Sequence, residues 1–388
     1  MIGKPPAAED YHSFLKRPVN RRFRYDADGL KPLTQRRNGY HWLDLSRLAA
    51  PRSALLPVQM VSSRIMTSRF LVIRDTTPAD VIPKGAVIAL GNFDGVHLGH
   101  RAVIGAAQRM ARARGSLAYA MTFEPHPRDF FNKGAPQFRL TDEVDKLRLL
   151  AGTGLDGAVV MTFDAARAGT SAQDFINHDL IGRLGISGIA VGYDFHFGKG
   201  RAGSPTLLQA EAPRLGIDVH VEPHFDIAGR AVSSSAIRAA LSEGKLDEAT
   251  AMLGYPWFAT SEVIHGEKRG RDLGYPTANM RLDPAVALRH GIYAVRAEVD
   301  GERIDGVASF GRRPTFDNGA PLLETFLFDF KGNLYGKTID VAFIGFIRPE
   351  LKFDSIEALI RQMDDDSAKA KAVLAAHPGA FPALGKVG

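Results

Sequence analysis

Two histidines spaced three residues apart close the decapeptide GNFDGVHLGH at 91–100. A short apolar run typical of a buried strand precedes it, and a stretch with helical spacing follows it. His97 and His100 therefore share one face of a first helical turn, where free backbone N–H groups and the helix dipole attract anions. Gly91 and Gly95 allow the backbone to turn tightly and to approach a ligand. This combination favours a polyphosphate site over a metal-binding HxxH pair or a chance helix cap.

A second candidate phosphate site is the segment GRDLGYPTAN at 270–279. Gly270 and Gly274 allow a loop that wraps phosphates. Thr277 and Asn279 are two residues apart, so on an extended segment their side chains point the same way. A hydroxyl and an amide oxygen are hard donors that suit Mg²⁺ bound to nucleotide phosphates. Taken alone, PTAN is equally compatible with a turn followed by an Asn cap.

Two different patterns of elements surround these segments. Between residues 70 and 225, short apolar strands alternate with helices, which is typical of a doubly wound parallel sheet with helices on both faces. Ligands of such sheets bind at the carboxyl ends of the strands, where the chain order switches. A helical linker at 234–253 follows, and then short alternating strands with glycine turns predict a small antiparallel β-barrel before a last helix at 355–375. The predicted strands of the sheet lie at 70–73, 86–91, 117–123, 157–163, 188–195 and 219–225, and its predicted helices at 98–114, 142–151 and 171–184.

We therefore expect an α/β plus β protein, with a sheet domain at 70–250 and a barrel domain at 251–380. The chain has 388 residues and no cysteine, which excludes disulfides, thiolate catalysis and cysteine-based metal sites. No apolar run approaches the ~18 residues of a membrane helix, and the first residues resemble neither a secretory signal nor a transit peptide. A cytoplasmic protein without a membrane partner is expected.

The net charge of +6 is unevenly distributed. Residues 1–69 contain 13 Lys and Arg against five Asp and Glu, a net +8, which leaves −2 on residues 70–388. The basic segment is either a flexible arm for nucleic acid or a membrane surface, or an unstructured extension that includes a mis-assigned start, with Met60 and Met66 as alternative starts. A basic run alone is weak evidence for binding, so the second interpretation is favoured.

The decapeptide at 91–100 resembles the HxGH signature of the nucleotidylyltransferase superfamily, in the form found in the FMN adenylyltransferase module of bacterial bifunctional riboflavin kinase/FAD synthetases. TFEPHP at 122–127, VGYDFHFGKGRAG at 191–203 and VSSSAIR at 232–238 resemble later motifs of that module in the same order. His196 stands where that family usually has Arg. The resemblance implies attack of the FMN phosphate on the α-phosphorus of ATP with loss of pyrophosphate, a transfer that needs positioning and charge neutralisation more than a protein nucleophile.

The resemblance also implies roles for individual residues. His97 and His100 would stabilise charge on the ATP phosphates, and Arg238 would bind the β and γ phosphates in a forked geometry. Asp94 would either order its loop or touch the nucleotide. The implied ATP-binding residues are Gly91, Asn92, Phe93, Asp94, Gly95, Ser234, Ser235 and Arg238, and the residues implied to line the flavin are Pro125, Pro127 and Asp194.

The segment at 270–279 resembles the riboflavin kinase signature G-R-x-L-G-[FY]-P-T-A-N, and the resemblance continues through LETFLFDF at 323–330 and FIRPELKF at 346–353. It implies that Glu324 is the base that accepts the proton of the ribityl 5′-hydroxyl as this attacks the γ-phosphorus of ATP. The alternative for Glu324 is an exposed strand residue. The implied ATP-binding residues of this module are Gly270, Gly274, Thr277 and Asn279, of which Thr277 and Asn279 would also hold Mg²⁺.

Two motif sets in the expected order predict a bifunctional enzyme. The barrel would phosphorylate riboflavin to FMN and the sheet domain would adenylylate FMN to FAD, both with ATP and Mg²⁺ and without nucleic acid. The alternatives are one active module, a different acceptor nucleotide, or a nucleic-acid-binding regulatory protein that uses the basic arm. The last is disfavoured because Glu324, Asn279 and both histidines are present and no basic residues interleave with aromatic ones on the body. The oligomeric state is left open.

Overall fold

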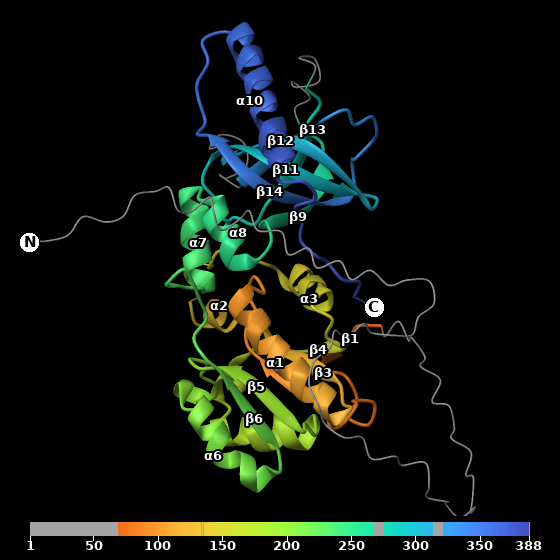
Figure 1. Ribbon diagram of the computed structural model, residues 1–388, viewed down its shortest axis with the longest axis vertical. Coiled ribbons are helices and arrows are strands. Elements are labelled where there is room, and N and C mark those ends of the chain that lie inside the picture. The colour runs from red at the N-terminus through yellow and green to blue at the C-terminus, as the bar shows by residue number, and fades with distance from the viewer. Residues whose placement is uncertain (1–68, 133, 135, 267–274, 313–320, 388) are drawn as a thin grey trace, which may run out of the picture. The chain divides into compact units, whose positions relative to one another are not determined.

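The computed structural model describes residues 69–387 except 133, 135, 267–274 and 313–320 (Figure 1). Gly270, Gly274 and the basic segment up to residue 68 therefore lie outside the described residues. The described residues all fall within one compact unit.

Six parallel strands form a sheet in the order β1-β4-β3-β2-β5-β6. From β2 the chain adds β3 and β4 on one side and β5 and β6 on the other, so the strand order reverses at β2. Such a reversal leaves a crevice at the carboxyl ends of the strands. The strands are β1 (Leu71–Arg74), β2 (Val87–Leu90), β3 (Ala118–Glu124), β4 (Gly157–Thr162), β5 (Gly188–Gly192) and β6 (Asp218–Glu222).

Helices cover both faces of this sheet, as predicted, because alternate strand residues point to opposite sides. Ala89 and Ala120 belong to one core with α1, while Ile88 and Met121 belong to a second core with η3. The helices are α1 (Leu98–Arg114), α2 (Pro127–Phe131), α3 (Glu143–Gly152), α4 (Ala165–Gly169), α5 (Ala172–Asp174), the π-helix η3 (Phe175–Arg183), the 3₁₀-helix η4 (Lys199–Arg201) and α6 (Pro205–Leu215).

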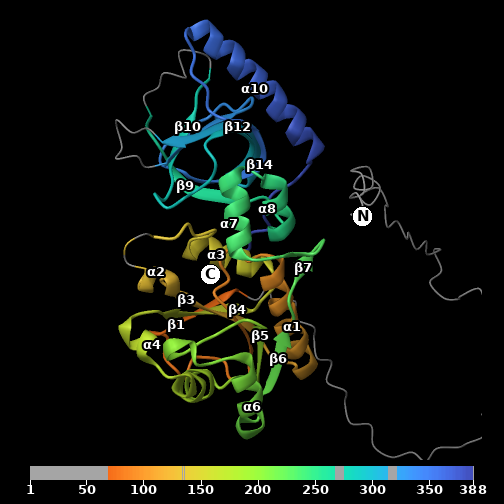
Figure 2. The same ribbon diagram turned by 90° about the vertical axis from the view of Figure 1, so that its left-hand side faces the viewer.

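The predicted helix at 98–114 agrees with α1, which ends at Gly115 in the left-handed conformation. The predicted linker at 234–253 is two helices, α7 (Ser234–Glu243) and α8 (Leu246–Leu253), because Gly244 adopts φ +75° and ends the first. Both helices lie between the strands of the sheet and those of the barrel (Figures 1 and 2). A short hairpin, β7 (Asp226–Ile227) and β8 (Arg230–Ala231), comes just before α7.

The predicted barrel is a closed antiparallel barrel with the strand order β10-β13-β12-β11-β14-β9. Asp300 and Gly301 connect β11 to β12 with φ of +52° and +86°, the conformation that an Asp-Gly hairpin turn requires. The barrel elements are β9 (Phe258–Ile264), β10 (Ala278–Arg281), β11 (Gly291–Val299), β12 (Glu302–Arg312), β13 (Pro321–Leu327), β14 (Thr338–Arg348) and the helix α10 (Ile356–Ala376).

A buried polar cluster joins α3 to the barrel. Arg148 Nη1 donates to Asp145 Oδ1 at 3.0 Å and to Asp340 Oδ1 at 2.8 Å. Thr260 Oγ1 lies within hydrogen-bonding distance of both carboxylates, 3.0 Å from Asp145 Oδ1 and 2.7 Å from Asp340 Oδ1. Burial raises the pKa of Asp145 to about 6, and the nearby carboxylates Asp142 and Asp340 act in the same direction. The cluster therefore holds three charged groups against each other at the contact between sheet and barrel.

Candidate active sites

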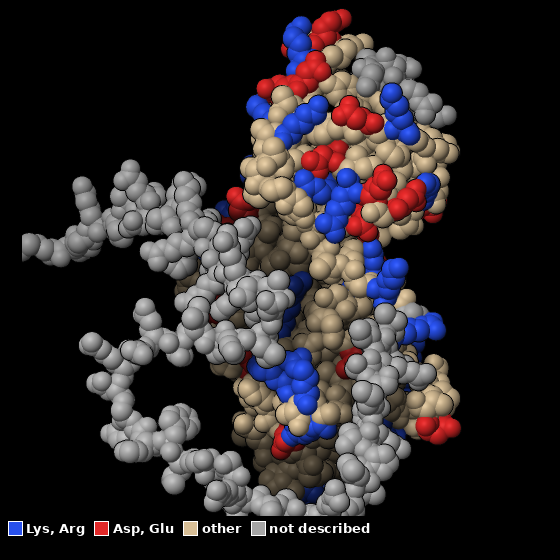
Figure 3. Space-filling model, turned by 45° about the vertical axis from the view of Figure 1, so that its right-hand side comes forward, with Lys and Arg blue, Asp and Glu red and all other residues tan. Residues whose placement is uncertain are grey.

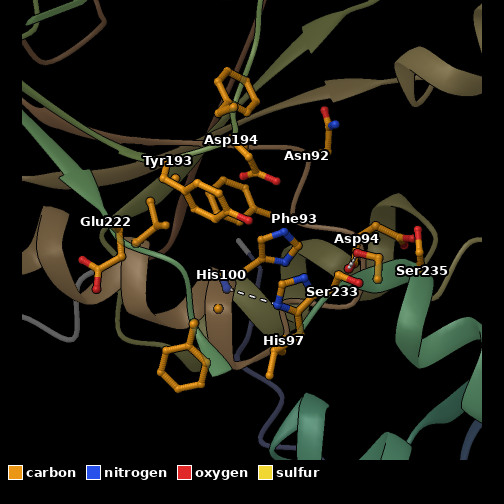
Figure 4. A pocket seen from close by; sticks show the side chains of 18 of the residues that line it. Asn92, Phe93, Asp94, His97, His100, Tyr193, Asp194, Glu222, Ser233 and Ser235 are labelled. Atoms are coloured by element: carbon orange, nitrogen blue, oxygen red, sulfur yellow. Dashed lines mark hydrogen bonds between the residues drawn. The ribbon is translucent and has the colours of Figure 1, made fainter. Parts of the chain in front are cut away.

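A pocket of about 510 Å³ opens at the carboxyl ends of β2, β3, β5 and β6, where the strand order reverses (Figure 4). It brings together residues that lie up to 148 positions apart in the sequence, from Leu90 to Arg238. The predicted residues that line it are Gly91, Asn92, Phe93, Asp94, His97, His100, Asp194, Ser234, Ser235 and Arg238.

Three predicted residues do not line this pocket. Gly95 lies behind it, where its N–H donates to Thr141 Oγ1 at 3.1 Å and its carbonyl accepts from Tyr255 at 2.6 Å. Pro125 and Pro127 are also absent from the lining, which contains instead their neighbour His126. The TFEPHP motif therefore contributes to the pocket through the imidazole of His126.

The two histidines lie against each other at the start of α1. His97 caps this helix because its Nδ1 accepts from the backbone N–H of His100 at 3.3 Å. The two rings stack with centroids 3.6 Å apart. A Cβ on Gly99 would come within 3.2 Å of the His97 ring, so the glycine between the histidines leaves room for it.

Burial lowers the pKa of His97 to about 4 and holds that of His100 well below its usual range. Both imidazoles are therefore neutral near pH 7. With Nδ1 of His97 occupied as an acceptor, its Nε2 carries the proton and can donate to an anion. His100 Nδ1 is buried and has no hydrogen-bond partner among the described residues. An approaching phosphate would raise the pKa of both rings, because a negative charge favours the protonated form.

Asp94 connects the loop after β2 to α7. Its Oδ1 accepts from the backbone N–H groups of Leu140 and Thr141 at 2.9 and 3.2 Å, and its Oδ2 lies 2.7 Å from Arg238 Nη1. Burial raises the pKa of the carboxyl group, whereas Arg238 and the Thr141 N–H act in the opposite direction. Ser234 Oγ donates to the Asp94 carbonyl at 2.9 Å. Both carboxylate oxygens thus contact protein groups, and Oδ2 orients the guanidinium of Arg238.

Sequence reasoning missed Lys146, which is fully buried on α3 beneath the same loop. Its Nζ lies 2.6 Å from Glu124 Oε1 and 3.4 Å from Thr122 Oγ1. Thr122 in turn donates to the Asn92 carbonyl at 3.0 Å. A lysine at a helical position looks like a solvated residue in the sequence. Glu124 inside the TFEPHP motif was the one signal that a buried cation lies nearby.

The second predicted site lies on the barrel. In the register of β10 and β13, Asn279 is opposite Glu324, and on its other side Glu324 pairs with Ser309 of β12. The neighbouring positions Ala278 and Thr325 are also opposite each other, and both are buried. Because strand residues alternate between faces, Asn279 and Glu324 share the other face.

The Asn279 side chain is fixed by local contacts. Its Nδ2 donates to the carbonyl of Thr277 at 3.2 Å, so its amide oxygen can bind another partner. A Cβ on Gly266 would lie 2.5–2.8 Å from the Asn279 amide, so any larger residue there would displace this amide. No cluster of three or more His, Asp or Glu able to hold a metal occurs in the part of the chain that the structure describes. A metal bound by Thr277 and Asn279 could complete its coordination shell with nucleotide phosphates and water.

The fold and the two sites define a two-part, ATP-dependent transferase with a nucleotidylyltransferase-type sheet and a kinase barrel. The model of the FAD synthetase family matches residues 80–236, and that of the riboflavin kinase family matches residues 253–374. The bifunctional riboflavin kinase/FMN adenylyltransferase of Haemophilus influenzae is 39% identical over 303 residues, which cover 78% of this chain and 98% of that protein. The protein of the same description from Bacillus subtilis is 37% identical and is covered over 91% of its length.

The chain belongs to the family of bifunctional riboflavin kinase/FMN adenylyltransferases. It therefore combines a riboflavin kinase and an FMN adenylyltransferase of flavin biosynthesis, and such enzymes use ATP and typically a divalent metal ion. A solved structure titled as a macrolide-efflux protein from Streptococcus pneumoniae has a similar fold, with a TM-score of 0.69 and 29% identity over 77% of this chain and 98% of that one. Among the described residues, no helix is both long and apolar enough to span a bilayer.

Proposed function

We propose that the pocket of the sheet carries FMN adenylylation and that the face of the barrel around Glu324 carries riboflavin phosphorylation. The observation that supports the first site is the convergence of both histidines, the α7 N-terminus and Arg238 at the switch point of the sheet. An oxygen of the FMN phosphate attacks the α-phosphorus of ATP, and pyrophosphate leaves. No proton has to be removed from the attacking phosphate monoanion or dianion, so the protein acts by orientation and charge neutralisation.

Several of the predicted residues in this pocket have a part in that step. The Nε2–H of His97, together with His100, donates to the phosphates as negative charge moves to the leaving group. The Ser235 hydroxyl and the first backbone N–H groups of α7 hold the β and γ phosphates. Arg238 binds them from an orientation set by Asp94. Asp194 lies on the flavin side, and Gly91, Asn92 and Phe93 form the loop over the nucleotide.

On the barrel, Glu324 accepts the proton of the ribityl 5′-hydroxyl as its oxygen attacks the γ-phosphorus. Thr277 and Asn279 would hold Mg²⁺, and the ion would supply charge neutralisation at the ATP phosphates. The neutral donor set of Thr277 and Asn279 fits an ion that arrives with ATP rather than one held by the protein alone. Gly270 and Gly274, which lie outside the described residues, are proposed to wrap the phosphates.

We also propose the domain limits 70–250 and 251–380, with residues 1–69 as an extension that neither reaction uses. The proposed substrates are small molecules, without a nucleic-acid partner. On the face drawn in Figure 3, basic and acidic side chains alternate over the barrel, so this face of the barrel offers no uniform basic patch to a nucleic acid. Consumption of ATP supports a cytoplasmic location.

Glu324→Gln and His100→Ala test the two sites in one protein. With riboflavin, ATP and Mg²⁺, chromatography of the flavins should show that Glu324→Gln lowers FMN formation about 10²–10⁴-fold while added FMN is still converted to FAD. His100→Ala should do the reverse, with about 10²-fold slower FAD formation and unchanged FMN formation. Loss of both activities in either variant would contradict separate sites.

A further inference from the structure

Tyr193 belongs to a hydrogen-bonded chain at the pocket that the proposed chemistry does not use. The Tyr193 hydroxyl lies 2.7 Å from His224 Nδ1, and His224 Nε2 lies 2.7 Å from Asp226 Oδ1. Tyr193 follows β5 directly, His224 comes shortly after β6, and Asp226 begins the β7–β8 hairpin. These hydrogen bonds therefore connect the ends of β5 and β6 and the β7–β8 hairpin around the pocket.

The chemistry of the three groups sets the direction of these hydrogen bonds. An ionised carboxylate only accepts, so His224 Nε2 carries the proton that it donates to Asp226. Where Nδ1 of the same ring carries no proton, it accepts the O–H of Tyr193. The two rings also meet edge to face, with centroids 5.1 Å apart at 89°. Tyr193 is thus held at both its hydroxyl and its ring.

The hydrogen bonds that fix Tyr193 contribute to the pocket rather than to the stability of the core. Tyr193 is 49% exposed, and the side chains of His224 and Asp226 are 43% and 47% exposed, so the contacts among them contribute little to stability. Yet Tyr193 and His224 both line the pocket. In Figure 4, Tyr193 and Asp194 lie on one side of the two histidines, and Ser233 and Ser235 lie on the other.

The charges differ between these two sides of the pocket. Arg238 and the α7 N-terminus suit phosphates, whereas the carboxylates Asp194 and Glu222 line the pocket near Tyr193 and would repel them. Carboxylates can accept hydrogen bonds from the amino, imide or hydroxyl groups of a nucleoside. The aromatic side chains Phe93 and Phe195 line the same pocket. This side therefore suits a flat, polar-edged ring.

We propose that the Tyr193 ring is a stacking wall for a flat heteroaromatic ring, either the adenine of ATP or the isoalloxazine of FMN, and that His224 and Asp226 are positioning residues that hold this wall. The proposal rests on the assignment of adenylyl transfer to this pocket. Fixing the phenol before the ligand arrives lowers the ordering cost of binding, and aromatic stacking itself is worth about ten- to a hundredfold in affinity.

Steady-state FMN adenylylation by Tyr193→Ala tests the wall, with the KM values for ATP and for FMN measured separately. We expect one KM to rise at least about tenfold while the other changes less than about twofold, and the KM that rises identifies the stacked ring. Riboflavin phosphorylation by the same sample reports on folding. Phe131→Ala is the matched control, because Phe131 is 68% exposed and does not line the pocket. If neither KM changes more than about twofold, the proposed stacking role of Tyr193 is refuted.

Two further variants test the positioning roles. Tyr193→Phe and His224→Leu should each raise the same KM by about threefold, with kcat retained, because the ring stays but loses its anchor. A fall in kcat with both KM values unchanged would overturn this role. If Tyr193→Ala does not fold, Tyr193→Leu replaces it, since it keeps bulk without a planar ring. Failure of the pocket assignment is separately visible, because His100→Ala would then leave FAD formation intact.

Discussion

Removal of the Asp94 carboxylate should destabilise the protein and stop only one of its reactions. Asp94 is 3% exposed and the Arg238 side chain 14%, so the 2.7 Å pair between them is shielded from water. Asp94→Ala leaves the guanidinium without this partner and the N–H groups of Leu140 and Thr141 without their acceptor.

The burial of this pair sets the size of the expected loss in stability. Leaving one member of a buried ion pair unpaired costs about 3–5 kcal/mol, and Ser235 still offers Arg238 a weak contact at 3.4 Å. We therefore expect Asp94→Ala to lower the free energy of unfolding by about 4 kcal/mol. Asp94→Asn keeps an oxygen for the two N–H groups and loses only the charge, so about 2 kcal/mol is expected. The double variant Asp94→Asn/Arg238→Met should recover part of this loss, because no unpaired charge remains.

Urea unfolding followed by the fluorescence of Trp257 measures these differences. Trp257 is a suitable probe because it is buried and its Nε1 donates to the carbonyl of Leu140 at 2.9 Å, next to the backbone that Asp94 holds. FAD formation should fall in both single variants while riboflavin phosphorylation continues. A cost below about 1 kcal/mol for Asp94→Ala would refute the reasoning, since it would place Asp94 among ordinary surface ion pairs.

The remaining predictions concern pKa values and the buried lysine. The pKa of Asp145 is raised from 3.8 to about 6, so the folded state binds its proton more tightly, and stability should fall as the pH rises from about 4 to 6. Asp145→Asn should remove this slope and add up to about 3 kcal/mol at pH 7; unfolding curves with parallel pH dependence would contradict this. The His97 imidazole should titrate near pH 4 by NMR without nucleotide and at a higher pH with ATP, and an unchanged midpoint would exclude phosphate contact. Lys146→Met leaves Glu124 with Arg139 alone, so it should cost about 3 kcal/mol in urea unfolding, whereas an unchanged midpoint would show that the pair is dispensable.

Local signals predicted most of the elements because they depend on neighbours in sequence. The bounds of α1 follow from the His97 cap and from Gly115, whose left-handed conformation ends the helix. The predicted helical linker at 234–253 is divided at Gly244, where the same kind of glycine ends α7 before α8 begins. For η3, side-chain spacing predicted a helix but could not distinguish a π-helix, since both patterns place apolar residues on one face.

By itself, the sequence determined the family, the two folds and the residues that gather at the switch point, because motifs and hydrophobic periodicity are local properties. Only the tertiary structure decided the partners of those residues. Asp94 meets Arg238 144 positions away, Lys146 is buried against Glu124, and Tyr193 is anchored by His224. These contacts arise from the order of the strands in the sheet, which brings distant strand ends together, and no spacing along the chain records which of their atoms meet.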